Sequence, residues 1–249
     1  MSVLRQFLCM AATGAALVAV GCGGEERTPP TVYAAASLRD VFPELDKAPR
    51  YNFAGSNQLQ TQIERGAPAD VFASASAKEP DALFKAGRCS QPVPFASNAV
   101  VLLVPAGNPG KVTSLESLTS GPRRRLAVGT EDVPVGKYTR QLLENAGMRT
   151  ILERNTVSNE ANVASLTSKV ALGSADAGFA YNTDARAAGD RVEVIRLPAE
   201  TQPKIQYLLC AVKRKGANAK AAEAFIATVT SPDGRDALER QGFGPPPGT

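Results

Sequence analysis

Two short stretches of this chain each place a serine where a strand-like run passes into a helix-like pattern. They read V-Y-A-A-A-S-L at residues 32–38 and Y-N-F-A-G-S-N-Q-L at residues 51–59, and their serines are Ser37 and Ser56. The start of a helix carries unpaired backbone N–H groups and the positive end of the helix dipole. A serine hydroxyl beside those groups adds another hydrogen-bond donor. The two junctions therefore indicate binding of a small anion rather than catalysis.

A simpler interpretation is that the two serines only cap their helices. Ser37 is followed three residues later by Asp40, as in a capping box. However, the two junctions follow successive predicted strands, and ligands of open α/β sheets bind at the carboxyl ends of strands. We therefore expect Ser37 and Ser56 to lie at a ligand site.

The sequence offers little for an enzyme. It has no histidine among its 249 residues, which excludes Ser–His–Asp and Cys–His catalytic sites. It also lacks a phosphate-binding Walker loop, and without histidine or a close cysteine pair it has no pattern for a metal site. Ser168 and Lys169 leave a serine–lysine hydrolase as an alternative, although adjacent helical residues face different ways. We expect no catalytic residue, no metal site and no cofactor.

Composition and charge also limit the possible partners. The net charge is +4, aromatic residues make up 6% of the chain and tryptophan is absent, which does not favour the broad basic and aromatic surface of a nucleic-acid-binding protein. With 43% hydrophobic residues, the chain can form one large core or two modest ones. We expect no contact with nucleic acid.

The N-terminus has the pattern of an export signal. Residues 7–20 are apolar after Arg5, and the stretch is too short for a comfortable membrane span. It leads to Cys22 and a G-G-E-E run, which resembles a bacterial lipoprotein signal in which the cysteine is lipidated. We therefore predict a signal peptide at residues 1–21, a tether at residues 22–30, and a periplasmic or cell-surface protein whose membrane contact is the lipid on Cys22. The alternative is an ordinary cleaved signal, with Cys22 incidental.

Two further cysteines remain after that signal. Cys89 and Cys210 would lie in an oxidising compartment, which permits a disulfide between them. The alternative is two separate buried thiols, because the sequence does not show whether the two residues lie within bonding distance.

Hydrophobic runs alternate with helical patterns through most of the chain, which predicts an α/β fold. The expected strands are residues 32–35, 51–54, 71–74, 99–104, 126–128, 177–181, 192–197 and 206–212. The expected helices are residues 57–65, 137–146, 162–172 and 218–230, with another beginning at Ser231-Pro232. A further helix after Ser37 has to be short or kinked because Pro43 lies within it.

Two places suggest that the chain crosses twice between two lobes. The expected strand near residues 101–104 ends in P-A-G-N-P, as a strand leaving one lobe would, and the strand near residues 205–212 can return to it. We therefore predict a first lobe made of residues 31–105 and 207–249 and a second lobe made of residues 106–206. A ligand is expected in the cleft between them.

Six motifs resemble the periplasmic molybdate-binding proteins of ABC transporters, in order along nearly all of residues 31–244. They are Y-A-A-A-S-L (33–38), F-A-G-S (53–56), Q-I-E-R-G-A-P-A-D-V-F-A-S-A (62–75), L-A-V-G (126–129), V-P-V-G-K-Y (133–138) and G-F-A-Y (178–181). The G-A-P-A-D-V-F segment is the most distinctive of them. The resemblance implies a two-lobed type II periplasmic-binding-protein-like fold, each lobe a mixed sheet flanked by helices, with the ligand cleft between the lobes.

The resemblance also implies which residues hold the oxyanion. Matched motif by motif, the donors are the hydroxyls of Ser37, Ser56 and Tyr181 and the backbone amides of Val135 and Val163. The chain departs from the family at Gly55 and Asn57, where serines are often found, and at Val135, where alanine is usual.

By resemblance, the protein would capture molybdate or tungstate outside the cytoplasm, as a monomer, and deliver the anion to an ABC permease. A site of donors alone suits a fully deprotonated dianion, because a protonated phosphate would also need an acceptor for its hydroxyl group. Sulfate meets the same condition, so a sulfate-type oxyanion-binding protein is the nearest alternative. A sensor that binds the same anion without a permease, and the serine–lysine hydrolase, are the others.

Overall fold

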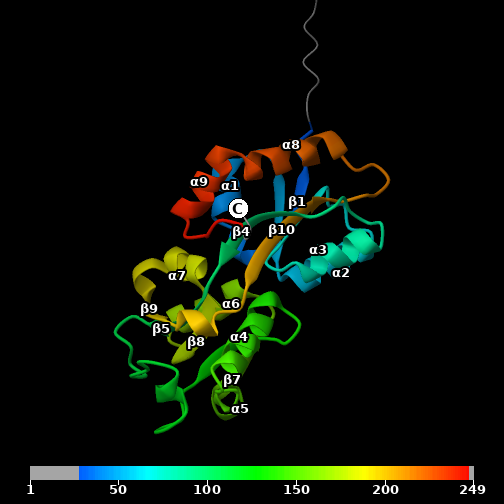
Figure 1. Cartoon of the computed structure of the whole chain (residues 1–249). Helices are drawn as coiled ribbons and strands as arrows, with labels where there is room; N and C mark the ends of the chain where they lie inside the picture. Colours follow the sequence, from blue (N-terminus) through cyan, green and yellow to red (C-terminus); the bar gives the residue numbers. More distant parts are fainter. Residues whose placement is uncertain (1–27, 247–249) are drawn as a thin grey trace, which may run out of the picture.

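The computed structural model describes residues 28–246 (Figure 1). The predicted signal peptide, Cys22 and the tether as far as residue 27 lie outside this range, so these predictions stay predictions. None of the helices in the described range combines the length and the apolar character needed to cross a membrane.

The described residues form two five-stranded sheets, each in a lobe of its own (Figure 1). In spatial order, the first sheet contains β2 (Arg50–Ala54), β1 (Thr31–Ala35), β3 (Val71–Ser74), β10 (Ile205–Ala211) and β4 (Val93–Asn98). β1 is parallel to β2 and β3, whereas β10 is antiparallel to β3 and β4. The helices of this lobe, which we call lobe I, are α1 (Val41–Leu45), α2 (Ser56–Glu64), α3 (Lys78–Lys85), α8 (Ala219–Thr230) and α9 (Pro232–Arg240).

The second lobe, lobe II, repeats this plan. Its sheet contains, in spatial order, β7 (Thr156–Glu160), β6 (Leu126–Gly129), β8 (Ala177–Tyr181), β5 (Val100–Pro105) and β9 (Val192–Arg196). β6 is parallel to β7 and β8, and β5 is antiparallel to β8 and β9. Its helices are α4 (Pro134–Asn145), α5 (Thr150–Asn155), α6 (Val163–Ala171) and α7 (Asn182–Ala188). The chain also makes short 3-10 turns at η1 (Ala36–Leu38), η2 (Glu116–Leu118), η3 (Gly189–Arg191) and η4 (Ala199–Thr201).

The predicted α/β class and the eight predicted strands are confirmed, but the sequence did not indicate β4 and β7. Both lie at an edge of their sheet. β4 contains Pro94, which an edge strand tolerates, and ends in two polar residues, while β7 reads T-V-S-N-E. Neither strand has the apolar run that marks a strand buried in the middle of a sheet.

The predicted lobe boundary at residue 105 is wrong. β5 lies inside the sheet of lobe II, between β8 and β9, and all six of its residues are buried. A strand with neighbours on both edges and helices over the sheet is apolar throughout, which is why V-V-L-L-V-P was mistaken for a strand of lobe I. The chain therefore crosses at Ala99, between β4 and β5, and returns through β10. Figure 1 shows β4 and β10 running from one lobe towards the other.

The two serines of the opening motifs do not cap helices. Ser37 lies inside η1, whose N-cap is Ala35, and Ser56 is the first residue of α2, whose N-cap is Gly55. Neither N-cap residue provides a side-chain capping hydrogen bond, although the Gln58 Oε1 accepts one from the Gly55 N–H at 3.3 Å. The α-helix after Ser37 is only five residues long and includes Pro43, as the proline required. The capping box predicted for Ser37 and Asp40 is therefore absent, and both hydroxyls are free for other partners.

The structure contradicts the predicted disulfide. Cys89 and Cys210 are free thiols, fully buried in the same hydrophobic cluster of lobe I. The Cys89 thiol lies 3.6 Å from the Pro80 carbonyl oxygen, and a hydrogen bond with Cys210 lowers its pKa. The two side chains are thus neighbours, but a disulfide also requires an oxidant that removes two protons and two electrons.

The distinctive G-A-P-A-D-V-F segment has a structural role. The Asp70 carboxylate accepts hydrogen bonds from the backbone N–H groups of Thr31 and Asn218, both at 2.9 Å. It also forms a 2.7 Å ion pair with Arg214, with the Asp70 side chain 6% exposed. Asp70 therefore connects three segments of lobe I: the start of β1, the start of α8 and the chain just after β10. These contacts hold the strands of the lobe I sheet in register at the end away from the ligand-binding edge.

Candidate functional site

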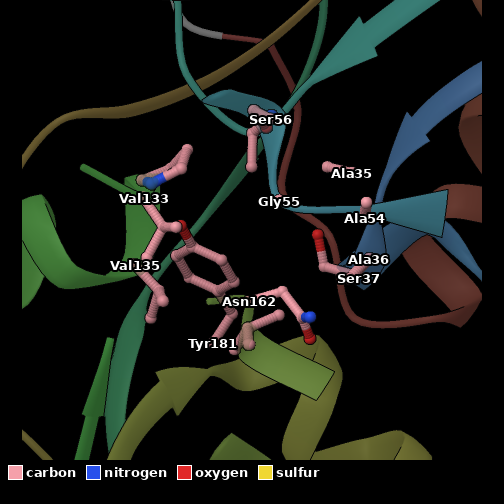
Figure 2. A pocket seen from close by; sticks show the side chains of 13 residues that line it. Ala35, Ala36, Ser37, Ala54, Gly55, Ser56, Val133, Val135, Asn162 and Tyr181 are labelled. Atoms are coloured by element: carbon pink, nitrogen blue, oxygen red, sulfur yellow. The ribbon is translucent and has the colours of Figure 1, made fainter. Parts of the chain in front are cut away.

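A small pocket lies where the two lobes meet (Figure 2). Its empty volume is about 240 Å³, and because this figure includes space open to solvent, the enclosed space is smaller still. Its lining residues are Ala35, Ala36, Ser37, Ala54, Gly55, Ser56, Ala75, Val133, Pro134, Val135, Asn162, Val163 and Tyr181. The pocket therefore suits a ligand of a few atoms.

All five residues that the sequence predicted for the site line this one pocket. Lobe I contributes Ser37 after β1 and Ser56 after β2. Lobe II contributes Val135, the second residue of α4, Val163, the first residue of α6, and Tyr181, the last residue of β8. Each follows the carboxyl end of a parallel strand, the edge where α/β sheets bind ligands.

The lining residues that the sequence reasoning did not assign are mostly small. The triple alanine after β1 supplies Ala35 and Ala36, and Ala54, Gly55 and Ala75 come from the next two strand ends. Small side chains leave backbone groups accessible, so the runs of alanine and glycine beside each serine were the available signal. Val133, Pro134 and Asn162 were not assigned because the resemblance named only the backbone amides of Val135 and Val163, which follow them in the chain.

Three helix starts point donors towards the pocket. In α4, Pro134 has no N–H, so Val135 supplies the first amide donor of that helix. In α6, the Asn162 side chain accepts from the Ser165 N–H at 2.9 Å and so fixes where the helix begins. With α2, whose first residue is Ser56, these helices also direct the positive ends of their dipoles at the same space.

The Ser56 hydroxyl is held so that it donates. Its Oγ accepts a hydrogen bond from the backbone N–H of Ala75 at 3.1 Å, and the residue is 1% exposed. A backbone N–H can only donate, so the Ser56 proton is free for a second partner. The Ser37 Oγ has a comparable contact, 2.9 Å from the Tyr207 hydroxyl.

Tyr181 has a buried hydroxyl without a partner. The residue is 1% exposed, and its Oη has no hydrogen-bond partner among the described residues. Figure 2 shows its ring in the middle of the pocket, between the serines of lobe I and the valines of lobe II. Burial raises the pKa of Tyr181 well above its ordinary value, helped by Tyr207 and Tyr138, so the phenol stays a neutral donor. An unsatisfied buried hydroxyl is unfavourable, which indicates that a ligand completes it.

None of the described residues that line the pocket carries a charged side chain. Lys137 is the nearest basic residue in the sequence motif, but its Nζ pairs with Glu79 of lobe I at 3.5 Å. Burial lowers the pKa of Lys137, and Lys78 lowers it further, while Glu79 opposes both. Lys137 therefore forms an ion pair that joins the two lobes.

The two lobes touch at the rim of the pocket. A Cβ atom placed on Gly55 of lobe I would lie 2.5 Å from the Ala161 carbonyl oxygen of lobe II, closer than real Cβ contacts. The φ and ψ angles of Gly55, −63° and 138°, are accessible to any residue. Glycine is therefore needed here for the close approach of the lobes and not for the backbone conformation.

The chain matches the family model of bacterial extracellular solute-binding proteins over residues 30–244. It belongs to that family. Membership makes this an extracytoplasmic protein that binds a solute. The molybdate-binding protein ModA of Mycobacterium tuberculosis (strain ATCC 25618 / H37Rv) is 36% identical to it over 251 residues, which cover 93% of this chain and 94% of the relative.

Solved structures of the same architecture bind different anions. The periplasmic molybdate-binding protein of Azotobacter vinelandii superposes with a TM-score of 0.76 at 24% identity, over 87% of this chain and 99% of that chain. The sulfate-binding protein SubI of M. tuberculosis superposes with a TM-score of 0.72 at 19% identity, over 88% of this chain and 87% of that chain. These two likenesses establish the two-lobed solute-binding fold, and they do not choose between the anions.

Tyr181→Phe tests whether the unpaired hydroxyl serves a ligand. Without ligand, we expect the free energy of unfolding to stay the same or rise by up to about 1 kcal/mol, because a buried group without a partner is removed. The affinity for molybdate should fall about 10- to 100-fold, since a donor to a charged acceptor contributes roughly 1.5–3 kcal/mol. Urea unfolding and isothermal titration calorimetry measure the two quantities.

Tyr138→Phe is the matched control for this substitution. Its ring packs against Tyr181 with centroids 6.4 Å apart, but its hydroxyl bonds to the backbone of Gln206 and not to the pocket. We expect it to lower stability slightly and to leave affinity unchanged. A Tyr181→Phe variant that loses stability but keeps its affinity would show that the hydroxyl has no ligand role.

Proposed function

We propose that this protein captures molybdate between its lobes. The observation that carries the proposal is the pocket itself, in which two serine hydroxyls, helix-start amides and the unpaired Tyr181 hydroxyl converge and none of the described lining residues is charged. The name of the M. tuberculosis relative supports the choice of molybdate. Ser37, Ser56, Val135, Val163 and Tyr181 are the proposed ligand-binding residues.

The donor set favours a tetrahedral anion that carries no proton. Every group assigned to the ligand offers a hydrogen, so each oxygen of the anion can accept. Hydrogen phosphate would place its own O–H against these donors, and an unpaired buried hydroxyl costs roughly 1–3 kcal/mol. Molybdate and tungstate carry no proton near neutral pH and are nearly equal in size, so we propose that both bind. Sulfate is smaller and would leave some donors too distant when the lobes are closed.

The remaining parts of the proposal concern the setting of the protein. We propose that it hands its anion to an ABC permease, acts as a monomer and is held to the membrane by a lipid on Cys22. It needs no cofactor. A sulfate carrier is the main alternative within the same fold. A second alternative is a sensor that binds the same anion without a permease. Transporter genes next to the gene for this protein would favour the carrier, and their absence would favour the sensor.

The hydrolase alternative receives no support from the geometry. Lys169 Nζ lies 2.7 Å from Glu160 Oε1 and also contacts the Ser158 hydroxyl, so it is engaged in an ion pair on α6 and β7. A catalytic lysine has to reach the serine as an uncharged base. Here the Lys169 Nζ is held by Glu160 of β7.

Thermal unfolding with different oxyanions tests the proposed function. At a concentration of a thousand times the dissociation constant, a ligand stabilises the fold by about 4 kcal/mol. For a chain of this size, that corresponds to a rise in Tm of about 10 °C. We expect this rise with molybdate and with tungstate, a small rise with sulfate and none with phosphate. Absence of a rise with both molybdate and tungstate would overturn the proposal, and a larger rise with sulfate would favour the alternative.

Gly55→Ala tests whether capture requires the lobes to close to the distance seen here. The added methyl group would collide with the Ala161 carbonyl oxygen, so we expect the affinity for molybdate to fall at least about tenfold. The unfolding free energy should change by less than about 0.5 kcal/mol, because the severe clash is with the backbone of the other lobe, and the Asn57 Oδ1 of lobe I, 3.0 Å from the added methyl group, can move aside. Small-angle scattering should show ligand-induced compaction in the unmodified protein and less of it in the variant. Equal affinity and equal compaction would contradict this account of closure.

A further inference from the structure

A buried chain of hydrogen bonds leads away from the pocket behind Ser37. The Ser37 Oγ lies 2.9 Å from the hydroxyl of Tyr207 on β10, and the Asn98 Nδ2 lies 3.4 Å from that same hydroxyl. Asn98, at the end of β4, also donates to the Thr183 hydroxyl of α7 at 2.9 Å. Tyr207 is fully buried and does not line the pocket. The chain therefore passes through both strands that connect the lobes.

The direction of each hydrogen bond follows from the orientation of the Asn98 amide. The backbone N–H of Ala99 donates to Asn98 Oδ1 at 2.9 Å, which turns the Nδ2 group towards Tyr207. An amide nitrogen of this kind can only donate, so the Tyr207 oxygen accepts. The phenol also has one proton of its own, and donation to the Ser37 Oγ is the arrangement in which this buried proton has a partner among the described residues.

The phenol keeps that proton well beyond the pH at which an exposed tyrosine would lose it. Burial raises the pKa of Tyr207 far above its ordinary value, and the nearby Asp184 carboxyl adds to the rise, while the hydrogen bonds to Ser37 and Asn98 only reduce it. Tyr207 therefore remains a neutral donor to Ser37. The Ser37 hydroxyl, having accepted, has its own proton available for the pocket.

Ser37 and Ser56 then have different hydrogen-bond partners, but in both residues the hydroxyl proton is left free for the pocket. For Ser56, the backbone N–H of Ala75 occupies the oxygen and leaves the proton free. For Ser37, the Tyr207 phenol has this role. If Ser37 instead donated to Tyr207, its lone pairs would face the oxyanion and repel it.

From this geometry, and on the basis of the proposed oxyanion-binding function, we propose that Tyr207 and Asn98 are positioning residues that orient the Ser37 hydroxyl as a donor to the bound anion. Neither residue touches the ligand. They act through Ser37, and through it they contribute to affinity and to the preference for an anion without a proton.

A double-mutant cycle tests this proposal. The Tyr207 ring also packs against Tyr181, with centroids 6.1 Å apart, but among the described pocket residues its hydroxyl is hydrogen-bonded to Ser37 alone. Tyr207→Phe keeps the ring contacts with Phe95 and Phe243 and removes only the hydroxyl. We expect it to lower the affinity for molybdate about three- to tenfold in the unmodified protein, and by less than about twofold in a Ser37→Ala background. The preference for molybdate over phosphate should also fall, because a freely rotating Ser37 hydroxyl can turn its oxygen towards a protonated anion.

Tyr51→Phe is the matched control. Its hydroxyl is also in lobe I and part-buried, but it donates to the backbone carbonyls of Phe42 and Asp46. It should lower stability without changing affinity in either background.

If Tyr207→Phe does not fold, Asn98→Ala is the second variant, because it removes the donor that sets the direction of the Tyr207–Ser37 hydrogen bond. Its effect on affinity should likewise vanish in the Ser37→Ala background. Thr183→Val removes the hydrogen bond between Asn98 and lobe II and keeps the one between Asn98 and Tyr207. It therefore shows how much of the Asn98 effect comes from the contact with lobe II and how much from the orientation of Ser37.

The outcomes distinguish this proposal from the proposed function. If the unmodified protein binds molybdate but Tyr207→Phe keeps full affinity, the positioning role is wrong and the proposed function stands. The same conclusion follows if Tyr207→Phe lowers affinity equally with and without the Ser37 hydroxyl, because the tyrosine would then act by general packing. If the unmodified protein binds no molybdate, both proposals fail.

Discussion

A doubly charged anion enclosed between two lobes loses its water, and each of its oxygens then needs a hydrogen-bond donor that is already in place. The rest of this structure depends on meeting that need without a positive side chain. Neutral donors attract an anion strongly only when they are fixed in a site that excludes water, because groups that must first turn lose part of their contribution. The fold fixes them by placing each at the start of a helix or turn that follows a parallel strand.

Two lobes are needed because one sheet edge surrounds only part of a tetrahedral ligand. β4 and β10 connect the lobes, and the contacts beside the pocket hold them together: Gly55 approaches the Ala161 carbonyl, and Lys137 pairs with Glu79. A basic residue so close to an anion site would ordinarily be assigned to the ligand. Here its charge is engaged by a carboxylate that is almost completely buried, so the pocket keeps its neutral character and its selection rests on hydrogen-bond direction and size.

The sequence identified residues that line a common pocket because its signals are local. Each donor sits within a short motif at a strand end, so Ser37, Ser56, Val135, Val163 and Tyr181 could each be named without knowing the fold, and the structure brings all five to one pocket. The partners that orient them come from far along the chain. Ala75 reaches Ser56 across 19 residues and Tyr207 reaches Ser37 across 170, and no motif connects such pairs.

The errors in the predicted fold also come from contacts between residues that lie far apart in the sequence. β5 is apolar whether it belongs to lobe I or lobe II, and only its pairing with β8 and β9 assigns it to lobe II. The serines were predicted to cap helices because residue type favours that role, yet tertiary contacts with Ala75 and Tyr207 take the two hydroxyls instead. Cys89 and Cys210 lie in the same hydrophobic cluster of lobe I, far apart in the sequence, and both are free thiols in the structure.

A crystal structure of the protein with tungstate, located by the anomalous scattering of tungsten, tests the central claim most directly. We expect the metal at the centre of the pocket lined by both lobes, with its oxygens within hydrogen-bond distance of the Ser37, Ser56 and Tyr181 hydroxyls and of the amides of Val135 and Val163, and with no lysine or arginine nitrogen in contact. A tungsten position outside this pocket, or an anion held by a basic side chain, would contradict the account.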